Sequence, residues 1–492
     1  MEMQGGVKNG TLFQRKSETF LSVWFFLGWR WDNSEFLCNF VQLKQFSMMT
    51  DIQKLYEFYT RHPRVTTDSR DCPEGSIFIA LRGDSFDGNQ FAAQALEKGC
   101  SLAVVDDARV FADYERHPLA GKQMMLVPDA LQAFKDLARE HRRQFRIPVV
   151  GITGTNGKTT TKELVRAVLA QKFNVMATEG NFNNDVGVPK TLLRLAAEHE
   201  IAVVEMGASH PGDIRTLAQT AEPTCGLITN VGKAHLQGFG SLQGVISTKG
   251  ELYEFLATQP AATIFVNADN ALLTGILPAG VATVPYSQQA DMGGARVTGE
   301  LVACDPMLRL RWRDNTGDGT WHEVATHLIG SYNLDNVLAA VTVGLHFGVD
   351  DAAIDAAIEG YVPSNNRSQL THTPHNHLIV DAYNANPTSM AAALANFDVM
   401  QVKPKMAILG EMRELGDSSR EEHEKMVDAL QRYGFDQVWL VGDEFAHIEC
   451  PYRKFHDVAQ VKAAIAQCRP QGYYILIKGS NGNRLFELPE LL

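Results

Sequence analysis

The sequence lacks the features typical of secreted, membrane-inserted and nucleic-acid-binding proteins. Its seven cysteines are scattered without a C-x-x-C pair, so it carries no zinc signature, and we expect a reducing, cytoplasmic setting. No apolar run has the ~20 residues of a membrane-spanning helix. The net charge of −12 argues against a nucleic-acid partner, because contacts to phosphates along a strand need a basic face. A nucleotide ligand stays open, since it needs only a local positive site.

The sequence also lacks an arrangement for covalent catalysis. It contains no Ser-His-Asp or Cys-His pattern that would indicate a covalent enzyme intermediate. It contains no internal repeat and no low-complexity tract either. We therefore expect an ordinary globular protein without a covalent enzyme intermediate.

Residues 1–47 differ in composition from the rest of the chain. Residues 20–31 are dense in aromatic side chains and follow a basic pair, which loosely resembles a signal peptide. The apolar run is short, however, and no small-residue cleavage site follows it. We hypothesise that translation naturally begins at Met48 or Met49 and that the preceding segment is not part of the fold. Peptides from residues 17–44 in mass spectra of the native protein would contradict this hypothesis.

The remaining pattern predicts an α/β protein of three domains. A chain of 492 residues, 45% apolar and 21% charged, is expected to form two to four globular domains. The first is expected to be a small N-terminal α/β domain, the second a central parallel-sheet domain of the P-loop type, and the third a C-terminal Rossmann-like, doubly wound domain. Their expected bounds are residues 48–145, 146–325 and 326–492.

Alternating strand and helix patterns support this division. In the first domain the expected strands lie at residues 76–81 and 102–105, and the expected helices at residues 91–98 and 130–145. A hairpin over residues 296–321 is expected to close the second domain. In the third, the buried-strand patterns lie at residues 377–380, 406–409, 438–441 and 474–477, and the helical patterns at residues 389–396, 420–433 and 458–467.

The stretch GITGTNGKTT at residues 151–160 carries the clearest functional signal. It follows a short apolar run at residues 147–150, which predicts a buried strand, and precedes an amphipathic helix at residues 161–172. Strand, glycine loop and helix together bind phosphate, because glycines admit the anion to backbone N–H groups at a helix N-terminus. Lys158 is expected to reach the outer phosphates, and the Thr159 hydroxyl to hold Mg²⁺.

The strict P-loop pattern is not met in this stretch. Ile152 occupies the position where the first glycine is expected, so a plain glycine turn is the alternative. The succession GKTT between a strand and an amphipathic helix favours phosphate binding over that alternative.

Polar residues follow the predicted strands of the middle domain. Glu205 comes directly after the apolar run at residues 201–204, and His235 lies a few residues after the run at residues 225–229. Because ligands bind at the carboxyl ends of open parallel sheets, these side chains are expected to converge on a metal beside the phosphates. The alternative is that each is a structural residue. On sequence alone, Lys249 is interpreted as a solvated lysine of a helix.

The third domain shows the same arrangement. Asp381, Gly410 and Lys478 each follow one of its predicted strands directly. These residues are therefore expected at the ligand-binding edge of a second doubly wound sheet.

Several motifs resemble the Mur ligases, the amide-forming enzymes of bacterial cell-wall precursor synthesis. The loop TGTNGKT at residues 153–159 is similar to their ATP loop, which the related folylpolyglutamate synthetases share. Other runs resemble the branch that adds D-alanyl-D-alanine to UDP-N-acetylmuramoyl-tripeptide. They are GNFNN at 180–184 with GVP at 187–189, EMGA at 205–208, DAYNANPTSM at 381–390 and LGEMRELG at 409–416. The resemblance extends from about residue 64 to the C-terminus, and the run YNANP discriminates best.

The resemblance implies a monomeric, ATP-dependent and Mg²⁺-dependent ligase of peptidoglycan synthesis. The first domain would bind the UDP end of the substrate, the second ATP, and the third would close over the site with the incoming dipeptide. The residues implied for ATP are Thr153, Gly154, Thr155, Asn156, Gly157, Lys158, Thr159, Asn333, Asn336, Arg367 and Asp381. Those implied for two Mg²⁺ ions are Thr159, Glu205, His235 and Lys249. Those implied for the other substrates are Ser69, Arg70, Asn181, Asn184, Asn384 and Asn386.

Individual roles also follow from the resemblance. The catalytic set is Lys158, Lys249, His235 and Glu205. Lys249 matches the lysine that this family carbamylates with CO₂, which reverses the interpretation of a solvated helix lysine. Arg367 matches the arginine that reaches the γ-phosphate, and Asp381 the contact to the ATP ribose. Asn333 and Asn336 match the adenine-side motif.

The sequence departs from the family pattern at three positions. Tyr332 stands where a histidine usually precedes the asparagine, so the adenine edge is expected to be contacted differently. Asn89 stands where the family often has histidine, which puts the first-domain contact in doubt. Asn481 replaces a common arginine, although Arg484 is near enough to substitute. None of these departures touches the phosphate or magnesium chemistry.

The resemblance implies transfer of the ATP γ-phosphoryl group to the terminal carboxylate of the tripeptide, followed by attack of the dipeptide amine on the acyl phosphate. A related amide ligase with another acid or amine is an alternative, against which the YNANP run argues. A nucleotide-dependent switch is a further alternative. Such a switch would hydrolyse ATP without added substrates.

Overall fold

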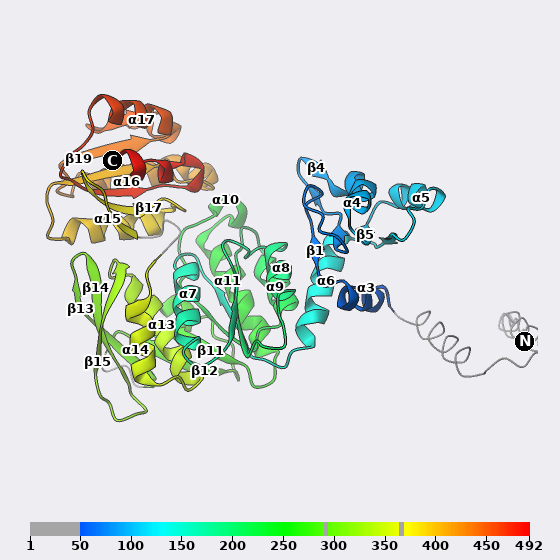
Figure 1. The fold of residues 1–492 in the computed structure, drawn as a ribbon. Helices are drawn as coiled ribbons and strands as arrows, with labels where there is room; N and C mark the ends of the chain where they lie inside the picture. Colours follow the sequence, from blue (N-terminus) through cyan, green and yellow to red (C-terminus); the bar gives the residue numbers. More distant parts are fainter. Residues whose placement is uncertain (1–49, 290–293, 364–368) are drawn as a thin grey trace, which may run out of the picture. The chain divides into compact units, whose positions relative to one another are not determined.

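The structure, a computed structural model, describes residues 50–289, 294–363 and 369–492 (Figure 1). The hypothesis on residues 1–47 and the expected role of Arg367 fall outside these ranges. The chain divides into two compact units between Arg61 and His62. The described part of the first unit contains helix α3 (Asp51–Arg61), whose buried side chains are Leu55, Phe58 and Tyr59.

The second unit begins with a four-stranded parallel sheet. Its order is β1-β2-β5-β6. The strands are β1 (Val65–Thr66), β2 (Ile77–Ile79), β5 (Leu102–Val105) and β6 (Gln123–Leu126), and the helices are α4 (Ala92–Lys98), α5 (Ala108–Arg116) and α6 (Ala130–Arg143). A small hairpin, β3 (Arg82–Gly83) with β4 (Phe86–Asp87), follows β2. The strands and helices predicted in this region are confirmed.

A nine-stranded sheet forms the middle of the second unit, with the order β15-β14-β13-β12-β11-β10-β7-β9-β8. The strands are β7 (Val149–Thr153), β8 (Val175–Ala177), β9 (Ile201–Glu205), β10 (Cys225–Ile228), β11 (Thr263–Asn267), β12 (Ala282–Ser287), β13 (Val297–Cys304), β14 (Met307–Asp314) and β15 (His322–Ile329). From β8 to β13 all pairings are parallel, and β13, β14 and β15 form an antiparallel meander. The expected hairpin is therefore part of a three-stranded meander.

Helices cover both faces of this sheet. Alternate side chains of β7 point to opposite faces, as in any strand, so Val150 and Ile152 join one apolar core and Val149 joins the other. The first core includes α7 (Lys158–Leu169), α13 (Asn333–His346) and α14 (Asp351–Gly360). The second includes α6, α8 (Gly187–Leu192), α9 (Asp213–Ala221) and α11 (Leu242–Ala257).

The strand order reverses at β7. The chain passes from β7 to β8 and β9 on one side and then returns to β10 on the other side. In a doubly wound sheet such a reversal opens a crevice at the carboxyl ends of the strands. The loop after β7, the end of β9 and the end of β10 all lie at this reversal.

The expected boundary between residues 325 and 326 falls inside β15 (His322–Ile329). Helix α13 packs on α7, and α14 packs on α7 and β15. The side chains of α13 and α14 share one apolar core with the middle sheet. These two helices therefore belong structurally with the middle sheet and not with the third domain, because their apolar faces are buried there.

The third domain has a six-stranded sheet with the order β16-β17-β21-β18-β19-β20. Its strands are β16 (Gln369–His372), β17 (His377–Asp381), β18 (Lys405–Gly410), β19 (Gln437–Val441), β20 (Arg453–Phe455) and β21 (Tyr474–Lys478). Only β16 pairs antiparallel. Helices α15 (Pro387–Val399) and α16 (Ser419–Leu430) share a core with one face, and α17 (Val458–Gln467) with the other. The predicted doubly wound domain is confirmed.

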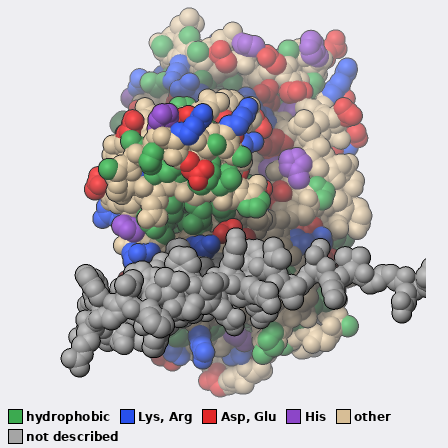
Figure 2. All heavy atoms as spheres, turned by 90° about the vertical axis from the view of Figure 1, so that its right-hand side faces the viewer, with side chains coloured by type: hydrophobic (Ala, Val, Ile, Leu, Met, Phe, Trp, Pro, Cys, Tyr) green, Lys and Arg blue, Asp and Glu red, His purple; other side chains and the backbone are tan. Residues whose placement is uncertain are grey.

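Two surface properties complete the description. No helix in the described ranges is long and apolar enough to cross a membrane. On the face shown in Figure 2, acidic and basic side chains of the described residues are interspersed with apolar ones. The described residues visible on this face therefore do not form a continuous region of one charge.

Candidate active site

A cavity of about 810 Å³ lies where the middle sheet reverses its strand order. Its lining includes the loop after β7, the end of β9, the start of α13 and residues of the third domain. The predicted site residues that line it are Thr155, Asn156, Gly157, Lys158, Thr159, Asn184, Glu205, His235, Asn333, Asn336, Asp381 and Asn384. Residues from two domains thus enclose one polar space.

Other predicted residues do not line this cavity. They are Ser69, Arg70, Thr153, Gly154, Asn181, Lys249 and Asn386. Thr153 is fully buried, and its hydroxyl donates to the Met206 carbonyl at 2.7 Å. Gly154 and Asn386 instead support the residues that do line the cavity.

The phosphate loop depends on two glycines in conformations that other residues rarely adopt. Gly154 has φ +145° and Gly157, which precedes α7, has φ +78°. A Cβ atom on Gly154 would lie 2.0 Å from the Thr229 hydroxyl oxygen, and one on Gly157 would lie 2.6 Å from the Asn336 amide oxygen. The loop is therefore pressed against its neighbours, and the N-terminus of α7 presents backbone N–H groups to an anion.

Asn230, which follows the end of β10, forms hydrogen bonds to the same loop. Asn230 accepts from Thr155 N at its backbone oxygen (2.9 Å) and from Asn156 N at its side-chain oxygen (3.0 Å). Its amide group donates to the Asn156 carbonyl at 3.0 Å. Lys158 Nζ donates to the carbonyls of Gly154 at 2.8 Å and Thr155 at 3.0 Å. The lysine ammonium is thus held beside the loop that would surround a phosphate.

Glu205 is a buried carboxylate at the end of β9. Only 1% of the residue is exposed. The Thr159 hydroxyl lies 3.1 Å and 2.9 Å from its two oxygens, and the Asn183 amide donates to one of them at 2.8 Å. All these donors are neutral, so they do not compensate the charge of the carboxylate. A buried carboxylate beside a hydroxyl matches the oxygen ligands that Mg²⁺ prefers.

His235 supplies a nitrogen in the same cavity. It has a left-handed backbone, with φ +50°, and begins helix α10 (Leu236–Phe239). Its buried Nδ1 contacts the Glu414 carboxylate, and this contact holds the pKa of the Glu414 carboxyl below its usual value. Among the described residues, no three His, Cys, Asp or Glu side chains are grouped so that they could hold a metal ion by themselves. The protein groups present therefore fit Mg²⁺ only as a partial ligand set, with phosphate oxygens of a nucleotide as further ligands.

Lys249 lies in α11 and is almost completely buried, with 2% of the residue exposed. Its Nζ lies 5.4 Å from the centre of the Phe239 ring. Burial, together with the charge of Lys158, holds the pKa of the Lys249 amine well below its usual value. The interpretation of Lys249 as a solvated helix lysine, which the sequence alone indicates, is therefore wrong, because the side chain is buried.

Two buried asparagines at the start of α13 form a chain of hydrogen bonds to helix α7, which follows the phosphate loop. Asn333 donates to the Ile329 carbonyl at 2.8 Å, and Asn336 donates to the Asn333 side-chain oxygen at 2.8 Å. The Asn336 oxygen accepts from the Thr161 hydroxyl at 3.0 Å. Tyr332, which replaces the usual histidine, lines the cavity next to them.

The third domain contacts the phosphate loop directly. Asn386 caps α15, where its oxygen accepts from Ser389 N at 2.9 Å and the Ser389 hydroxyl accepts from Asn386 N at 3.1 Å. The Asn386 amide group also donates to the Asn156 side-chain oxygen at 2.8 Å. Asn386 therefore connects α15 to the nucleotide loop, a position that the dipeptide role alone does not explain.

The first-domain residues Ser69 and Arg70 lie away from the cavity. The Arg70 guanidinium makes two hydrogen bonds to Asp68, at 2.9 Å and 2.7 Å, and its side chain is 87% exposed. This arginine lowers the pKa of the Asp68 carboxyl. The Ser69 carbonyl accepts from Lys98 Nζ at 2.8 Å. The loop is thus preformed and its arginine is available at the surface.

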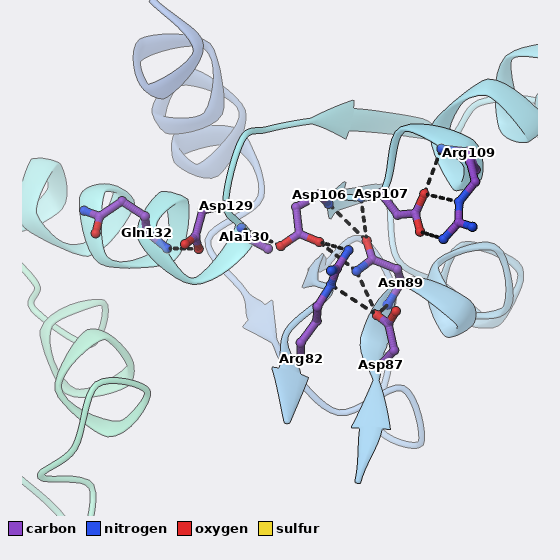
Figure 3. Close-up of polar contacts among 9 residues, drawn as sticks. All are labelled: Arg82, Asp87, Asn89, Asp106, Asp107, Arg109, Asp129, Ala130 and Gln132. Carbon is purple, nitrogen blue, oxygen red and sulfur yellow. Dashed lines mark hydrogen bonds and ion pairs between the residues drawn. The ribbon is translucent and has the colours of Figure 1, made fainter. Parts of the chain in front are cut away.

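Figure 3 shows that Asn89 has a structural position within the first domain. Its amide group donates to Asp87 and Asp106, both at 2.8 Å, and its oxygen accepts from the backbone N–H groups of Asp106 at 3.0 Å and Asp107 at 3.2 Å. Asp106 also accepts from Ala130 N at the start of α6 and pairs with Arg82 at 2.9 Å. The side chain that replaces histidine is therefore fully occupied in joining the hairpin to β5 and α6.

The asparagines of the 180–184 run divide into different roles. The Asn184 side-chain oxygen accepts from Val186 N at 3.3 Å and Gly187 N at 2.8 Å, in the turn that precedes α8, and the residue lines the cavity. Asn183, which the sequence did not single out, holds Glu205. Asn181 does not line the cavity.

Two further residues were missed by the sequence analysis as part of the site. Glu414, within the run LGEMRELG, contacts His235, and its carbonyl accepts from Gln237 N at 3.1 Å. Lys478 was placed at the edge of the sheet but received no role, and it lines the cavity. The motif containing Glu414 was visible in the sequence, but the contact across domains was not.

Three family models match the chain. They are the catalytic domain of the Mur ligase family at residues 63–142, the Mur ligase middle domain at residues 152–344, and the Mur ligase, glutamate ligase domain at residues 366–481. Together they span both the phosphate loop and the third-domain residues of the cavity.

Curated relatives and solved structures agree with these models. The UDP-N-acetylmuramoyl-tripeptide--D-alanyl-D-alanine ligase of Escherichia coli is 33% identical, over 87% of this chain and 93% of the relative. That of Bacillus subtilis is 32% identical, over 86% and 92%.

A crystal structure of MurF from Acinetobacter baumannii has 30% identity and a TM-score of 0.77, over 86% of this chain and 92% of that one. MurF ligase from Thermotoga maritima, in complex with ADP, has 25% identity and a TM-score of 0.76, over 90% and 98%. With its strand-end cavity, its glycine loop and these likenesses over most of its length, the chain belongs to the Mur ligase family, in the branch of the UDP-N-acetylmuramoyl-tripeptide--D-alanyl-D-alanine ligases.

Proposed function

We propose that this protein joins D-alanyl-D-alanine to UDP-N-acetylmuramoyl-tripeptide at the expense of ATP, giving the UDP-linked pentapeptide precursor of peptidoglycan, ADP and phosphate. The observation that carries the proposal is the shared cavity. The phosphate loop, Glu205 and His235 line it from the middle domain, and Asp381 and Asn384 line it from the third. A nucleotide-dependent switch needs only the first of these two groups.

The proposal assigns one substrate to each domain. The first domain, residues 48–145, binds the UDP end through the loop that contains Ser69 and Arg70. The middle domain binds ATP, and the third brings the dipeptide, with Asn384 beside the cavity. The packing of α13 and α14 on α7 supports a middle domain that extends to about residue 360.

The chemistry begins with a carboxylate, which is a poor electrophile. The γ-phosphoryl group of ATP passes to the terminal carboxylate of the tripeptide, and ADP leaves. The dipeptide amine then attacks the acyl phosphate, and the tetrahedral intermediate expels phosphate. Lys158 and the N–H groups at the start of α7 stabilise the charge spread over the transferred group. The closed third domain keeps water from hydrolysing the acyl phosphate.

Mg²⁺ belongs to this proposal as a bound cofactor. Thr159, Glu205 and His235 are the residues that would hold it, which the burial of the Glu205 carboxylate beside the Thr159 hydroxyl supports. When bound, it supplies positive charge that offsets repulsion between the anionic substrates. Glu414 would have to release the His235 Nδ1 for this nitrogen to serve as a ligand.

Lys249 is proposed to carry a carbamate. The neutral amine attacks CO₂, so that an N–C bond forms, one C=O π bond opens and a proton passes from the nitrogen to solvent. A neutral amine thereby becomes an anion, which would hold a second Mg²⁺. Nearly complete burial and a lowered amine pKa favour this reaction, since only the unprotonated amine is nucleophilic. The proposal further assigns the protein to the cytoplasm as a monomer.

The experiment that tests the proposed reaction uses tripeptide substrate with heavy oxygen in its terminal carboxylate. An acyl phosphate intermediate transfers one labelled oxygen to the released phosphate, while mass spectrometry of the other product shows the added dipeptide. Phosphate without label, or release without a pentapeptide product, would overturn the mechanism. Unlabelled phosphate formed without any substrate would favour the switch instead.

A further inference from the structure

Lys478 is a buried lysine for which the proposed reaction has no role so far. It ends strand β21, and only 1% of its side chain is exposed. It nevertheless lines the cavity, together with Asp381 and Asn384. A buried ammonium costs free energy unless its charge is paired and its N–H groups are hydrogen-bonded, so its contacts are informative.

The Lys478 ammonium bonds to both ends of one short loop. Asp381 lies opposite Lys478 in the pairing of β17 with β21, and the Lys478 Nζ contacts the Asp381 carboxylate at 2.6 Å. The same nitrogen donates to the Asn384 carbonyl at 3.3 Å. The chain between these acceptors, residues 382–383, is therefore bridged by a single side chain.

The bridged loop leads directly to the phosphate loop. Two residues after Asn384, Asn386 caps α15 and donates to Asn156 at 2.8 Å. Asp381 is the residue implied for the ATP ribose, and Asn384 is implied for the dipeptide. One buried cation thus sets the spacing between a nucleotide contact and a dipeptide contact.

A second lysine in the same sheet shows what a purely structural role looks like. Lys405 begins β18, the neighbour of β21, and is also buried, with 5% of the residue exposed. Its Nζ donates to the Asp398 carbonyl at 2.5 Å. Lys405 lies at the opposite end of the strands and does not line the cavity. Lys405 therefore lies at the amino ends of the parallel strands, and Lys478 lies at their carboxyl ends, where the cavity is.

We propose that Lys478 is a positioning residue that fixes the loop from Asp381 to Asn386, so that the nucleotide ribose and the incoming dipeptide are presented together. This role rests on the proposed function and goes beyond it, because it couples two substrate contacts through a residue that need not touch the reacting atoms. Removal of the ammonium leaves the Asp381 carboxylate without its cation and the Asn384 carbonyl without its donor.

The test compares Lys478→Met and Lys478→Arg with the matched control Lys405→Met. We expect Lys478→Met to raise the KM values for D-alanyl-D-alanine and ATP by roughly tenfold. The KM for UDP-N-acetylmuramoyl-tripeptide should stay within about twofold of that of the unchanged protein. Lys478→Arg keeps a charge that can bond both acceptors and should recover part of the loss. Lys405→Met should lower the thermal midpoint without changing the ratio of the KM values.

A second measurement needs no substrate. Hydrogen exchange of the backbone N–H groups in residues 381–386 should accelerate in Lys478→Met but not in Lys405→Met. Unchanged exchange in that loop, or equal changes of all three KM values, would overturn the positioning role. If the unchanged protein makes no pentapeptide, the proposed function fails, whereas the exchange measurement still decides whether Lys478 holds the loop.

Discussion

Lys249 and Lys478 are both lysines with almost completely buried side chains, but their surroundings differ. Lys478 has the Asp381 carboxylate at 2.6 Å, which compensates its charge. Lys249 has the charge of Lys158 nearby, and with burial this lowers its pKa. A paired ammonium is suited to holding a loop, and an unprotonated amine is suited to reaction with CO₂.

Replacement of the Lys249 side chain should therefore remove a reactive group without emptying the nucleotide site. We expect Lys249→Ala to reduce pentapeptide formation by roughly 10–100-fold or more. Added short carboxylic acids should restore part of the rate, because they supply an anion in the vacated space. Intact-mass measurement in the presence of CO₂ should show the extra mass of one CO₂ on the unchanged protein and none on the variant. An undiminished rate in Lys249→Ala would contradict this role.

Single residues also show what the sequence could and could not predict. Lys158, Thr159 and Glu205 were predicted because a loop motif or a strand end identifies them. The contact of Glu414 with His235 joins residues about 180 positions apart in two domains, and local patterns carry no information on such a pair. Asn89 could be recognised in the sequence as a departure from the family pattern. The four hydrogen bonds of its side chain, all within the first domain, could not be predicted from the sequence.

At the level of elements, the phosphate loop is the part most constrained by its neighbours. The Gly154 position lies against Thr229 of the strand end, and the Gly157 position lies against Asn336 of α13. Any side chain at these positions must displace an element that itself lines the cavity. The loop geometry and the first turn of α7 are thus fixed by three elements at once.

A methyl group at Gly154 should therefore weaken nucleotide binding more than it weakens the fold. In Gly154→Ala, we expect the Kd for ATP to rise roughly tenfold or more, equivalent to about 1.4 kcal/mol or more. Calorimetric titration with the nucleotide measures this change. Gly434→Ala is the matched control, because a Cβ there meets no atom within 4 Å. Equal nucleotide affinities in the two variants would show that the close approach at Gly154 is not important.

Helix α6 contains a buried histidine, His141, that contacts the segment after α8. The Nε2–H group of His141 donates to the Leu195 carbonyl at 2.9 Å, and burial lowers the pKa of the His141 imidazole below the usual 6.5. An unfolded chain then binds more protons than the folded one at pH values between the lowered pKa and 6.5. The stability should therefore decrease as the pH falls through this window and be fully present above it.

Thermal unfolding as a function of pH tests this expectation. The unchanged protein should lose stability on acidification below pH 6.5, and His141→Gln should flatten that dependence. His199→Gln serves as a comparison, since His199 lies in the same loop region after Leu195. A pH dependence that is unaltered in His141→Gln would assign the acid sensitivity to other groups.

Element boundaries illustrate a further limit of sequence patterns. Strand β5 and helix α17 were predicted at their observed bounds, because short apolar runs between polar turns define them well. The boundary at residues 325/326 was drawn just after the hairpin expected to close the middle domain, and it falls inside β15. Only the packing of α13 on α7 shows which sheet that helix covers.

At the level of the whole molecule, the site exists only where two domains meet. The middle domain supplies the phosphate loop and the metal-binding candidates, and the third supplies Asp381, Asn384 and Lys478. Asn156–Asn386 and His235–Glu414 connect the two domains at the cavity itself. We therefore expect phosphoryl transfer to depend on the arrangement of both domains and on all substrates that hold them together.

The most direct test of this account is the release of phosphate from ATP and Mg²⁺ while each substrate is omitted in turn. The account predicts fast release only when both UDP-N-acetylmuramoyl-tripeptide and D-alanyl-D-alanine are present. Omission of either substrate should reduce the rate by roughly tenfold or more, because the cavity is then incomplete. Equal consumption of ATP without either substrate would contradict the ligase and would instead indicate a nucleotide switch.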